Sequence, residues 1–362
     1  MIDRIILFPY YLILKARNHR YTKKNAKVAK AEVPTICIGN ITVGGTGKTP
    51  QVEMVLRMLL ESDEWGGKNI AVLSRGYKRR SRGFQQVPFE GSAFRFGDEP
   101  SQIKKKFPSV TVAVDKDRVE GCDLLCHPEK LQGGERSDII VLDDAFQYRK
   151  LKADKNIVLV DYNQPLAKDR LLPFGRLRDL PERIFQADMI VVTKCPSELS
   201  DEEKTAFIKS MGFKDYDPQT CQASCKEGVR KAFFTRIEYE PFKPVFDNSD
   251  PRYIYSKRLV LFTGIAKDHH LLSYLCDSYS VVERLSFPDH HKFSSADFRK
   301  IENAVRRNPT AAIATTEKDA QRVLDHNGLP LLLRERMFKV PIHPVFLTGT
   351  EEDIFKKELL TL

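Results

Sequence analysis

The sequence predicts an α/β protein with a doubly wound, mostly parallel sheet and a second, smaller α/β domain. Short, continuous apolar segments recur along the first two hundred residues, and charged amphipathic stretches separate most of them. The same alternation resumes after a proline-marked break. Parallel strands covered by helices have this appearance, because the covering buries both faces of the sheet.

The first strand is expected over residues 33–40, which are rich in β-branched side chains and stop at Gly39. A glycine-rich turn follows. From Gln51 onwards a helix is predicted, because apolar residues recur on one face at helical spacing. Further buried strands are expected in five short apolar segments: 69–73, 110–114, 138–142, 156–160 and 188–192.

The pattern breaks at residues 226–256. Residues 232–239 predict a strand, and Pro241, Pro244 and Pro251 mark a linker. A second α/β unit begins at Arg258 and continues through residues 311–315. We therefore expect a first domain over 31–225, a linker strand over 226–256 and a smaller C-terminal domain over 257–362.

The N-terminal residues 1–30 combine an apolar run with a basic tail. The run IILFPYYLIL covers residues 5–14, half of the ~20 residues that a membrane-spanning helix needs. Seven cations follow the run, whereas a signal peptide carries its charges before it. We expect a helix in the membrane interface whose cations meet anionic headgroups. The alternative is a core-packing helix with a solvated tail.

The charge balance favours anionic partners. Lys and Arg number 59 against 49 Asp and Glu, a net charge of +10. This favours nucleotides, nucleic acid or a phosphate-rich membrane without choosing among them. The basic stretch 74–90 is either a lid over an anionic ligand or a solvated loop.

The seven cysteines form no zinc pattern, so we expect reduced, mostly buried thiols.

The strongest motif is TVGGTGKT at residues 42–49. It matches the phosphate-binding P-loop pattern G-x-x-x-x-G-K-[ST] except that Thr42 replaces the first glycine. Small residues let backbone N–H groups turn toward phosphate oxygens, and the helix that follows points its positive end at them. Lys48 would reach the β- and γ-phosphates, and the Thr49 hydroxyl would bind Mg²⁺. The predicted nucleotide-binding residues are Val43, Gly44, Gly45, Thr46, Gly47, Lys48, Thr49 and Pro50.

A second element supports nucleotide binding. The apolar run 139–142 ends in Asp143 and Asp144, the form of a Walker B segment whose carboxylates hold Mg²⁺ directly or through water. After a later strand, Thr193 and Lys194 match part of a guanine-reading motif, but Pro196 stands where its aspartate belongs. We therefore predict a P-loop NTPase-type fold that binds ATP rather than GTP.

Two carboxylate-bearing segments are candidates for a general base. Asp98 and Glu99 lie in the turn 97–100, and Asp289, His290 and His291 lie far away in the second domain. A base near the γ-phosphate would assist attack by a hydroxyl. An Asp–His pair drawn from two domains would assemble only when the domains close. Ordinary surface turns are the alternative for each segment.

Eight runs together resemble the tetraacyldisaccharide 4′-kinase family, the lipid A 4′-kinases. In order over about residues 1–320 they are GNITVGGTGKTP, LSRGYKRRSRGF, FGDEP, DRVEGC, LDDAFQYRKL, LLPFGRLRD, FPDHHKF and TTEKDA. The resemblance implies transfer of the ATP γ-phosphate to the 4′-hydroxyl of a tetraacyldisaccharide 1-phosphate, giving lipid IVA. It also implies Mg²⁺ and peripheral attachment to the cytoplasmic face of an inner membrane.

The resemblance also assigns residues. It places the catalytic base at Asp98, its partner at His290 and the metal and phosphate region at Glu99, Asp143 and Asp144, beside Lys48 and Thr49 of the P-loop. Arg75, Tyr77, Arg118 and Arg178 match positions near the phosphates or the sugar. The family usually has DDGFQH where this chain has DDAFQY. Tyr148 therefore replaces a histidine and could supply only a hydrogen bond near pH 7.

Two rival functions are weaker. One is a P-loop enzyme acting on a soluble small molecule, which would need neither lipid nor the N-terminal segment. The other is a basic nucleic-acid-binding ATPase, but the only basic and aromatic cluster, residues 77–84, is short. We therefore expect no nucleic-acid partner, and the sequence makes no prediction of oligomeric state.

Overall fold

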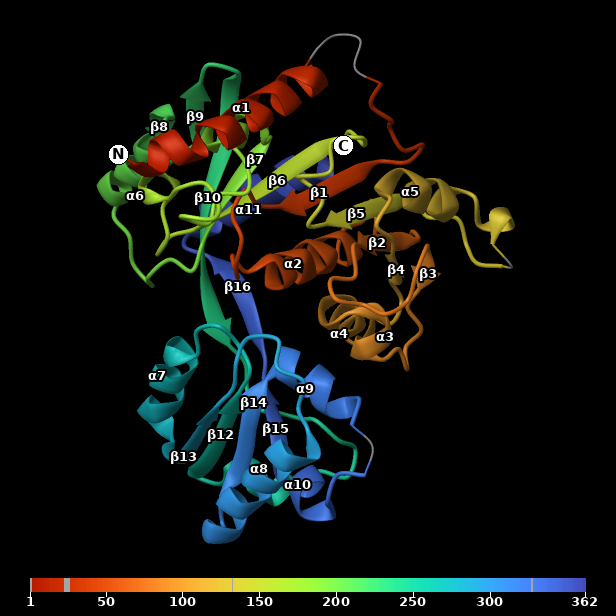
Figure 1. The fold of residues 1–362 in the computed structure, drawn as a ribbon, viewed down its shortest axis with the longest axis vertical. Coiled ribbons are helices and arrows are strands. Elements are labelled where there is room, and N and C mark those ends of the chain that lie inside the picture. The colour runs from red at the N-terminus through yellow and green to blue at the C-terminus, as the bar shows by residue number, and fades with distance from the viewer. Residues whose placement is uncertain (1, 23–26, 132, 327) are drawn as a thin grey trace.

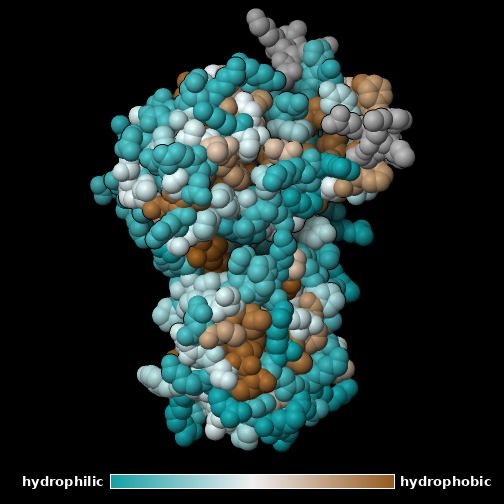
Figure 2. All heavy atoms as spheres, turned by 90° about the vertical axis from the view of Figure 1, so that its left-hand side faces the viewer, coloured by the Kyte–Doolittle hydropathy of each residue, from teal (hydrophilic) through white to brown (hydrophobic). Residues whose placement is uncertain are grey.

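The computed structural model describes residues 2–22, 27–131, 133–326 and 328–362. Two sheets organise these residues (Figure 1). The larger has 11 strands in the order β3-β4-β2-β5-β1-β6-β7-β10-β9-β8, with β16 paired to β10. The smaller has five, in the order β11-β15-β14-β12-β13. Figure 2 shows polar side chains over most of one face and a hydrophobic patch on the lower domain.

The centre of the large sheet is parallel and buried. Its strands are β1 (Thr35–Gly39), β2 (Ile70–Ser74), β4 (Thr111–Val114), β5 (Ile139–Asp143), β6 (Lys155–Asp161) and β7 (Met189–Thr193). Every pairing among them is parallel. A separate hydrophobic core covers each face. The predicted α/β class and these six strands are confirmed.

Short antiparallel strands extend this sheet at both edges. They are β3 (Gln85–Gln86), which pairs with β4, and β8 (Lys214–Asp217) and β9 (Gln222–Cys225) at the other edge. The helices of this domain are α2 (Lys48–Leu60), α3 (Ala93–Phe96), α4 (Asp98–Lys106), α5 (Arg118–Cys126) and α6 (Asp201–Ser210). The helix expected from Gln51 is therefore confirmed and begins at Lys48.

The second domain repeats the architecture on a smaller scale. Its strands are β11 (Lys243–Pro244), β12 (Arg258–Thr263), β13 (Ser280–Ser286), β14 (Ala312–Thr316) and β15 (Met337–Val340). Its helices are α7 (His269–Ser278), α8 (Ser295–Arg307), α9 (Glu317–Leu324) and α10 (Leu331–Arg336). Strands β12 to β15 pair in parallel, with helices beside them (Figure 1).

Two strands, β10 and β16, join the domains, and they correct the predicted boundaries. β10 (Gly228–Tyr239) pairs with β7 and β9 at its start and with β16 (Ile342–Phe346) at its end (Figure 1). It is therefore a strand of the large sheet as well as a connection. After β16, α11 (Gly349–Leu360) buries Phe355 and Leu359 in the first domain's core. The expectation that 257–362 forms the second domain is wrong from Ile342 onwards, because an amphipathic pattern does not say which core its apolar face joins.

The N-terminal helix α1 (Ile2–Thr22) lies against the first domain. Leu14 is buried, and the Arg17 guanidinium donates a hydrogen bond to the Gln147 carbonyl at 2.8 Å. Lys23 and Lys24 of the expected basic segment lie outside the described residues. Among the helices that the structure describes, none combines the length and apolar character that crossing a membrane requires.

The basic stretch 74–90 leaves β2 as a loop and returns as β3 on the sheet edge. Arg79 ties the loop together by donating to the carbonyls of Gly83 at 2.7 Å and Val114 at 3.1 Å. A role as a lid stays a prediction.

All seven cysteines are free thiols and five are buried, as expected.

Candidate active site

The P-loop occupies the turn between β1 and α2, as the motif predicted. Gly44 and Gly47 have φ angles of 107° and 82°, which side chains other than glycine adopt only under strain. Thr42 is not among the residues with positive φ, so its backbone does not require the glycine that the usual pattern has there. The departure at Thr42 is therefore compatible with the loop.

Neighbouring side chains donate hydrogen bonds to oxygens of the P-loop. The Thr193 hydroxyl donates to the Thr46 carbonyl at 2.9 Å, and Asn40 donates to the Thr46 hydroxyl at 2.8 Å. The Lys194 ammonium contacts the Gly45 carbonyl and forms an ion pair with Asp161 at 2.8 Å. Lys194 belongs to the motif fragment considered for guanine recognition, and its role here is to brace the phosphate loop.

Backbone donors of the loop stay available to a ligand. Within the parts of the chain that are described, no protein acceptor contacts the N–H groups of Gly45, Gly47 or Lys48. The first N–H groups of a helix have no partner within the helix, and they bind phosphate oxygens readily. This arrangement fits the predicted role of residues 43–50 in binding nucleotide phosphates.

Asp143 and Asp144 end β5 beside the loop but have different surroundings. Asp143 is 5% exposed and accepts a hydrogen bond from Ser74 at 2.9 Å. Burial, together with the charge of Asp144, raises the pKa of Asp143 to about 6. Burial also opposes the ionisation of Asp144, but Lys48 at 3.8 Å and Arg178 at 3.0 Å lower its pKa. The two adjacent carboxylates are thus electrostatically distinct.

These residues fit a magnesium ion. No ion pair to Asp143 exists within the described ranges, so its buried carboxylate suits a cation bound with the nucleotide. Mg²⁺ typically uses one or two protein carboxylates and completes its shell with phosphates and water. Among the described residues, no cluster of three or more His, Cys, Asp or Glu is arranged for a metal. Thr49, in the first turn of α2, would supply a hydroxyl.

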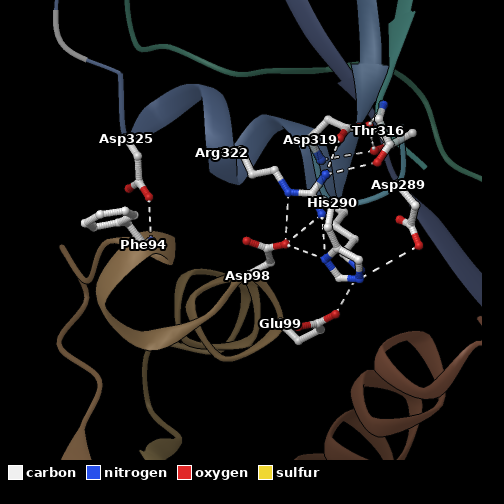
Figure 3. A network of polar contacts seen from close by, with 11 residues as sticks. Phe94, Asp98, Glu99, Asp289, His290, Thr316, Asp319, Arg322 and Asp325 are labelled. Atoms are coloured by element: carbon white, nitrogen blue, oxygen red, sulfur yellow. Dashed lines mark hydrogen bonds and ion pairs between the residues drawn. The ribbon is translucent and has the colours of Figure 1, made fainter. Parts of the chain in front are cut away.

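The candidate base Asp98 and its partner His290 meet across the two domains (Figure 3). Nδ1 of His290 lies 3.3 Å from Oδ2 of Asp98, although 192 positions separate them. Arg322 of α9 donates to the same oxygen from Nε at 2.9 Å and from Nη2 at 2.6 Å. Burial opposes ionisation, but the hydrogen bonds from His290 and Arg322 lower the pKa of Asp98 to about 2.

Glu99 also has a partner in the second domain. Lys318 of α9 lies 2.9 Å from Oε1 of Glu99 and 3.3 Å from Nε2 of His290. Glu99 is near enough to the nucleotide half of the site for its charge to raise the pKa of Asp143, after burial and Asp144. A metal-binding role for Glu99 stays a prediction. Lys318 lies in the TTEKDA run, and Arg322 lies four residues later on the same helical face, the spacing that could have indicated it.

The four residues predicted near phosphate or sugar differ in exposure. Arg178 contacts Asp144 and Asn40 at the end of β5, whereas Arg75 and Tyr77 are exposed. The Tyr77 ring meets His290 edge-on at 5.7 Å. Arg118 is buried and donates to the backbone carbonyls of Asp115 at 2.7 Å and Asp143 at 3.3 Å. Arg118 thereby supports the strand ends, and its contact with phosphate stays a prediction.

The residues that depart from the family pattern are accommodated. Ala145 is buried in the core. The Tyr148 hydroxyl donates to Asp117 at 2.7 Å, and Asp117 caps α5. Burial and this hydrogen bond raise the pKa of Tyr148 to about 12. Tyr148 therefore stays protonated and acts as a hydrogen-bond donor, as its chemistry predicted.

Comparison with known proteins places this geometry in context. A family model described as Tetraacyldisaccharide-1-P 4′-kinase matches residues 4–360. Two similar proteins, both named Tetraacyldisaccharide 4′-kinase, come from Flavobacterium johnsoniae and Phocaeicola vulgatus. The first is 38% identical over 349 residues, covering 95% of this chain and 93% of the relative. The second is 36% identical over 332 residues, covering 90% and 85%.

A solved structure is also similar over nearly the whole chain. It is the crystal structure of the "apo" form of LpxK from Aquifex aeolicus in complex with ATP. The two chains share 27% sequence identity and superpose with a TM-score of 0.69, and the match covers 99% of each.

Proposed function

Because this chain belongs to the tetraacyldisaccharide 4′-kinase family, we propose that the site described above performs that family's phosphate transfer. The protein is an ATP-dependent phosphotransferase with an alcohol group as acceptor. It transfers the γ-phosphate to the 4′-hydroxyl of a tetraacyldisaccharide 1-phosphate, a lipid A precursor, and gives lipid IVA. The comparisons support this activity over that of a P-loop enzyme with a soluble substrate.

The residue roles follow from the geometry. The P-loop N–H groups and Lys48 bind the β- and γ-phosphates and stabilise the charge that develops on them. Asp143, Asp144 and Thr49 would hold Mg²⁺, which, when bound, neutralises phosphate charge. Arg178 beside Asp144 adds a cation at the same edge.

Asp98 acts as the base. Its carboxylate takes the proton of the 4′-hydroxyl while the oxygen bonds to the γ-phosphorus, and the bond to the bridging oxygen breaks with its electron pair leaving on ADP. His290 orients the carboxylate. The observation that carries the proposal is the Asp98–His290 contact at 3.3 Å, because it joins segments 192 positions apart beside Glu99, whose charge reaches Asp143.

The test is phosphate transfer from labelled ATP to a tetraacyldisaccharide 1-phosphate in detergent micelles, with Mg²⁺ and with EDTA. We expect a labelled, doubly phosphorylated lipid only when Mg²⁺ is present. ATP hydrolysis without labelled lipid would retain the nucleotide site and discard the lipid as substrate.

We also propose that the protein attaches peripherally to the cytoplasmic face of the inner membrane through α1. Phe8, Leu12 and Ile13 are 57%, 47% and 63% exposed, while Leu14 on the same helix is buried. Such exposed side chains suit the acyl boundary of a bilayer. Charge substitution at Ile13 should weaken sedimentation with anionic vesicles by about tenfold or more. Unchanged sedimentation would exclude this attachment.

A further inference from the structure

Helix α9 of the second domain contacts the segment that carries the base. The side chains of α9 and of the residue after it reach α3 and α4 of the first domain. The contacts are Glu317 to Lys106 at 3.1 Å, Lys318 to Glu99 at 2.9 Å, Arg322 to Asp98 at 2.6 Å and Asp325 to the Phe94 N–H at 2.8 Å. Figure 3 shows α9 lying over α3 and α4 with Arg322 between them.

Arg322 is fixed on both sides. Two of its nitrogens donate to Oδ2 of Asp98, while Nη1 donates to the Gly264 carbonyl at 3.1 Å and to Asp319 at 2.8 Å. Asp319 is fully buried and accepts hydrogen bonds from the Gly264 N–H at 2.9 Å and the Thr316 hydroxyl at 2.7 Å. The Arg322 side chain is only 7% exposed. Its guanidinium therefore has one well-defined position.

The two carboxylate oxygens of Asp98 have different partners. His290 and both Arg322 donors contact Oδ2, and no donor in the described residues contacts Oδ1. A carboxylate fixed through one oxygen presents the other in a defined direction. Such fixation by supporting residues is what a general base needs.

We propose that Arg322 is a positioning residue for the phosphate transfer. Its guanidinium occupies Oδ2 of Asp98 so that Oδ1 accepts the proton of the acceptor hydroxyl. Arg322 belongs to the second domain, so the base is oriented only when α9 is docked on α4. This inference rests on the proposed function and extends it from the Asp98–His290 pair to the helix that holds it.

The charges around Asp98 agree with this role. Arg322 and Lys318 face it from α9, His290 and Asp289 come from the loop after β13, and Glu99 follows it on α4. Despite burial, hydrogen bonds from His290 and Arg322 hold the pKa of Asp98 at about 2. The carboxylate is therefore ionised at every physiological pH, although its affinity for a proton is reduced. Removal of Arg322 should move that pKa back toward the ordinary value.

The experiment compares Arg322→Ala, Arg322→Lys and the control Asp325→Asn in the lipid kinase assay at saturating Mg²⁺ and lipid, with the ATP concentration varied. We expect kcat of Arg322→Ala to fall about 10- to 100-fold, with KM for ATP changed less than about threefold. Added guanidinium ion should restore part of kcat. Arg322→Lys should be intermediate, because lysine keeps the charge and loses the fork.

Asp325→Asn weakens a contact of the same domain interface but does not touch Asp98. We expect it to keep kcat within about threefold and to be insensitive to guanidinium. Equal losses of kcat in Arg322→Ala and Asp325→Asn, with no rescue of either by guanidinium, would overturn the positioning role in favour of simple domain docking. Wild-type kcat in Arg322→Ala would overturn it too. An inactive wild-type protein would instead refute the proposed function.

Discussion

The nucleotide half of the site lies within one domain, whereas the half that carries the base is assembled from two. The P-loop follows β1, Asp143 is the last residue of β5 and Asp144 comes next. These are neighbouring parallel strands, with Ile38 opposite Asp143. In contrast, Asp98 lies on α4, and its partners His290 and Arg322 come from 192 and 224 positions away.

The charges differ as well. In the nucleotide half, Asp143 is buried without a paired cation in the described structure, and its pKa is raised to about 6, mainly by burial. In the other half, Asp98 is paired with Arg322 and Glu99 with Lys318. The first half therefore suits a cationic ligand beside Asp143, whereas the carboxylates of the second half pair with cations of the other domain. Substitutions in the two halves should have different effects.

The largest effect is expected for Asp98→Asn. An amide cannot take the hydroxyl proton, so turnover should fall about 10²- to 10⁴-fold. ATP binding should be unchanged, because the P-loop belongs to the other half. Turnover from labelled ATP and nucleotide titration by calorimetry measure the two quantities. Turnover within tenfold of wild type would show that the base is a different group.

Lys48→Met should affect binding and turnover together. Loss of a cation that stabilises phosphate charge costs about 10²- to 10³-fold in rate, and it also removes a contact to bound ATP. The same two measurements apply. If Lys48→Met bound ATP normally and only its turnover fell, its effect would match that of Asp98→Asn. The expected difference between the two halves would then be contradicted.

Lys106→Met should destabilise the junction between the halves. Lys106 of α4 forms ion pairs with Glu53 of α2 at 2.6 Å and with Glu317 of α9 at 3.1 Å. Glu53 is almost fully buried, so loss of its cation should cost about 3 kcal/mol in the free energy of unfolding. Urea denaturation measures this cost. Lys130→Met, which breaks an exposed pair with Asp123, is the control and should cost less than about 1 kcal/mol.

The smallest expected effect is on the free energy of unfolding, and its sign differs between the adjacent residues Asp143 and Asp144. Asp143→Asn should stabilise the magnesium-free protein by about 1–2 kcal/mol at pH 8, because it removes a buried, unpaired carboxylate. Asp144→Asn should destabilise it, because Lys48 and Arg178 lose their partner. Thermal unfolding without and with Mg²⁺ and ATP distinguishes the two. Equal shifts in one direction would contradict the different surroundings of the two carboxylates.

The pH dependence of that effect has a definite sign. The native pKa of Asp143, about 6, lies above the ordinary value of about 3.9, so the native state binds this proton more tightly than the unfolded chain. Its contribution to stability is therefore fully present below pH ~4 and is lost as pH rises to about 6. The gain in Asp143→Asn should vanish near pH 4.

Sequence alone determined the elements whose parts are neighbours along the chain. The apolar segments, the glycines of the phosphate loop and the carboxylates ending β5 are local patterns, and parallel strands bring their ends to one edge of a sheet. The pairing of Asp98 with His290 followed from chemistry together with the family resemblance.

Only the tertiary structure decided which distant charges meet. It revealed Arg322 and Lys318 beside Asp98 and Glu99, Lys194 behind the phosphate loop and the return of residues beyond Ile342 to the first domain. A lysine or arginine on the polar face of an amphipathic helix has the same sequence pattern whether that face contacts water or another domain. Its partner is set by how whole faces pack, because that packing fixes both the distance between charges and the burial that makes their pairing necessary.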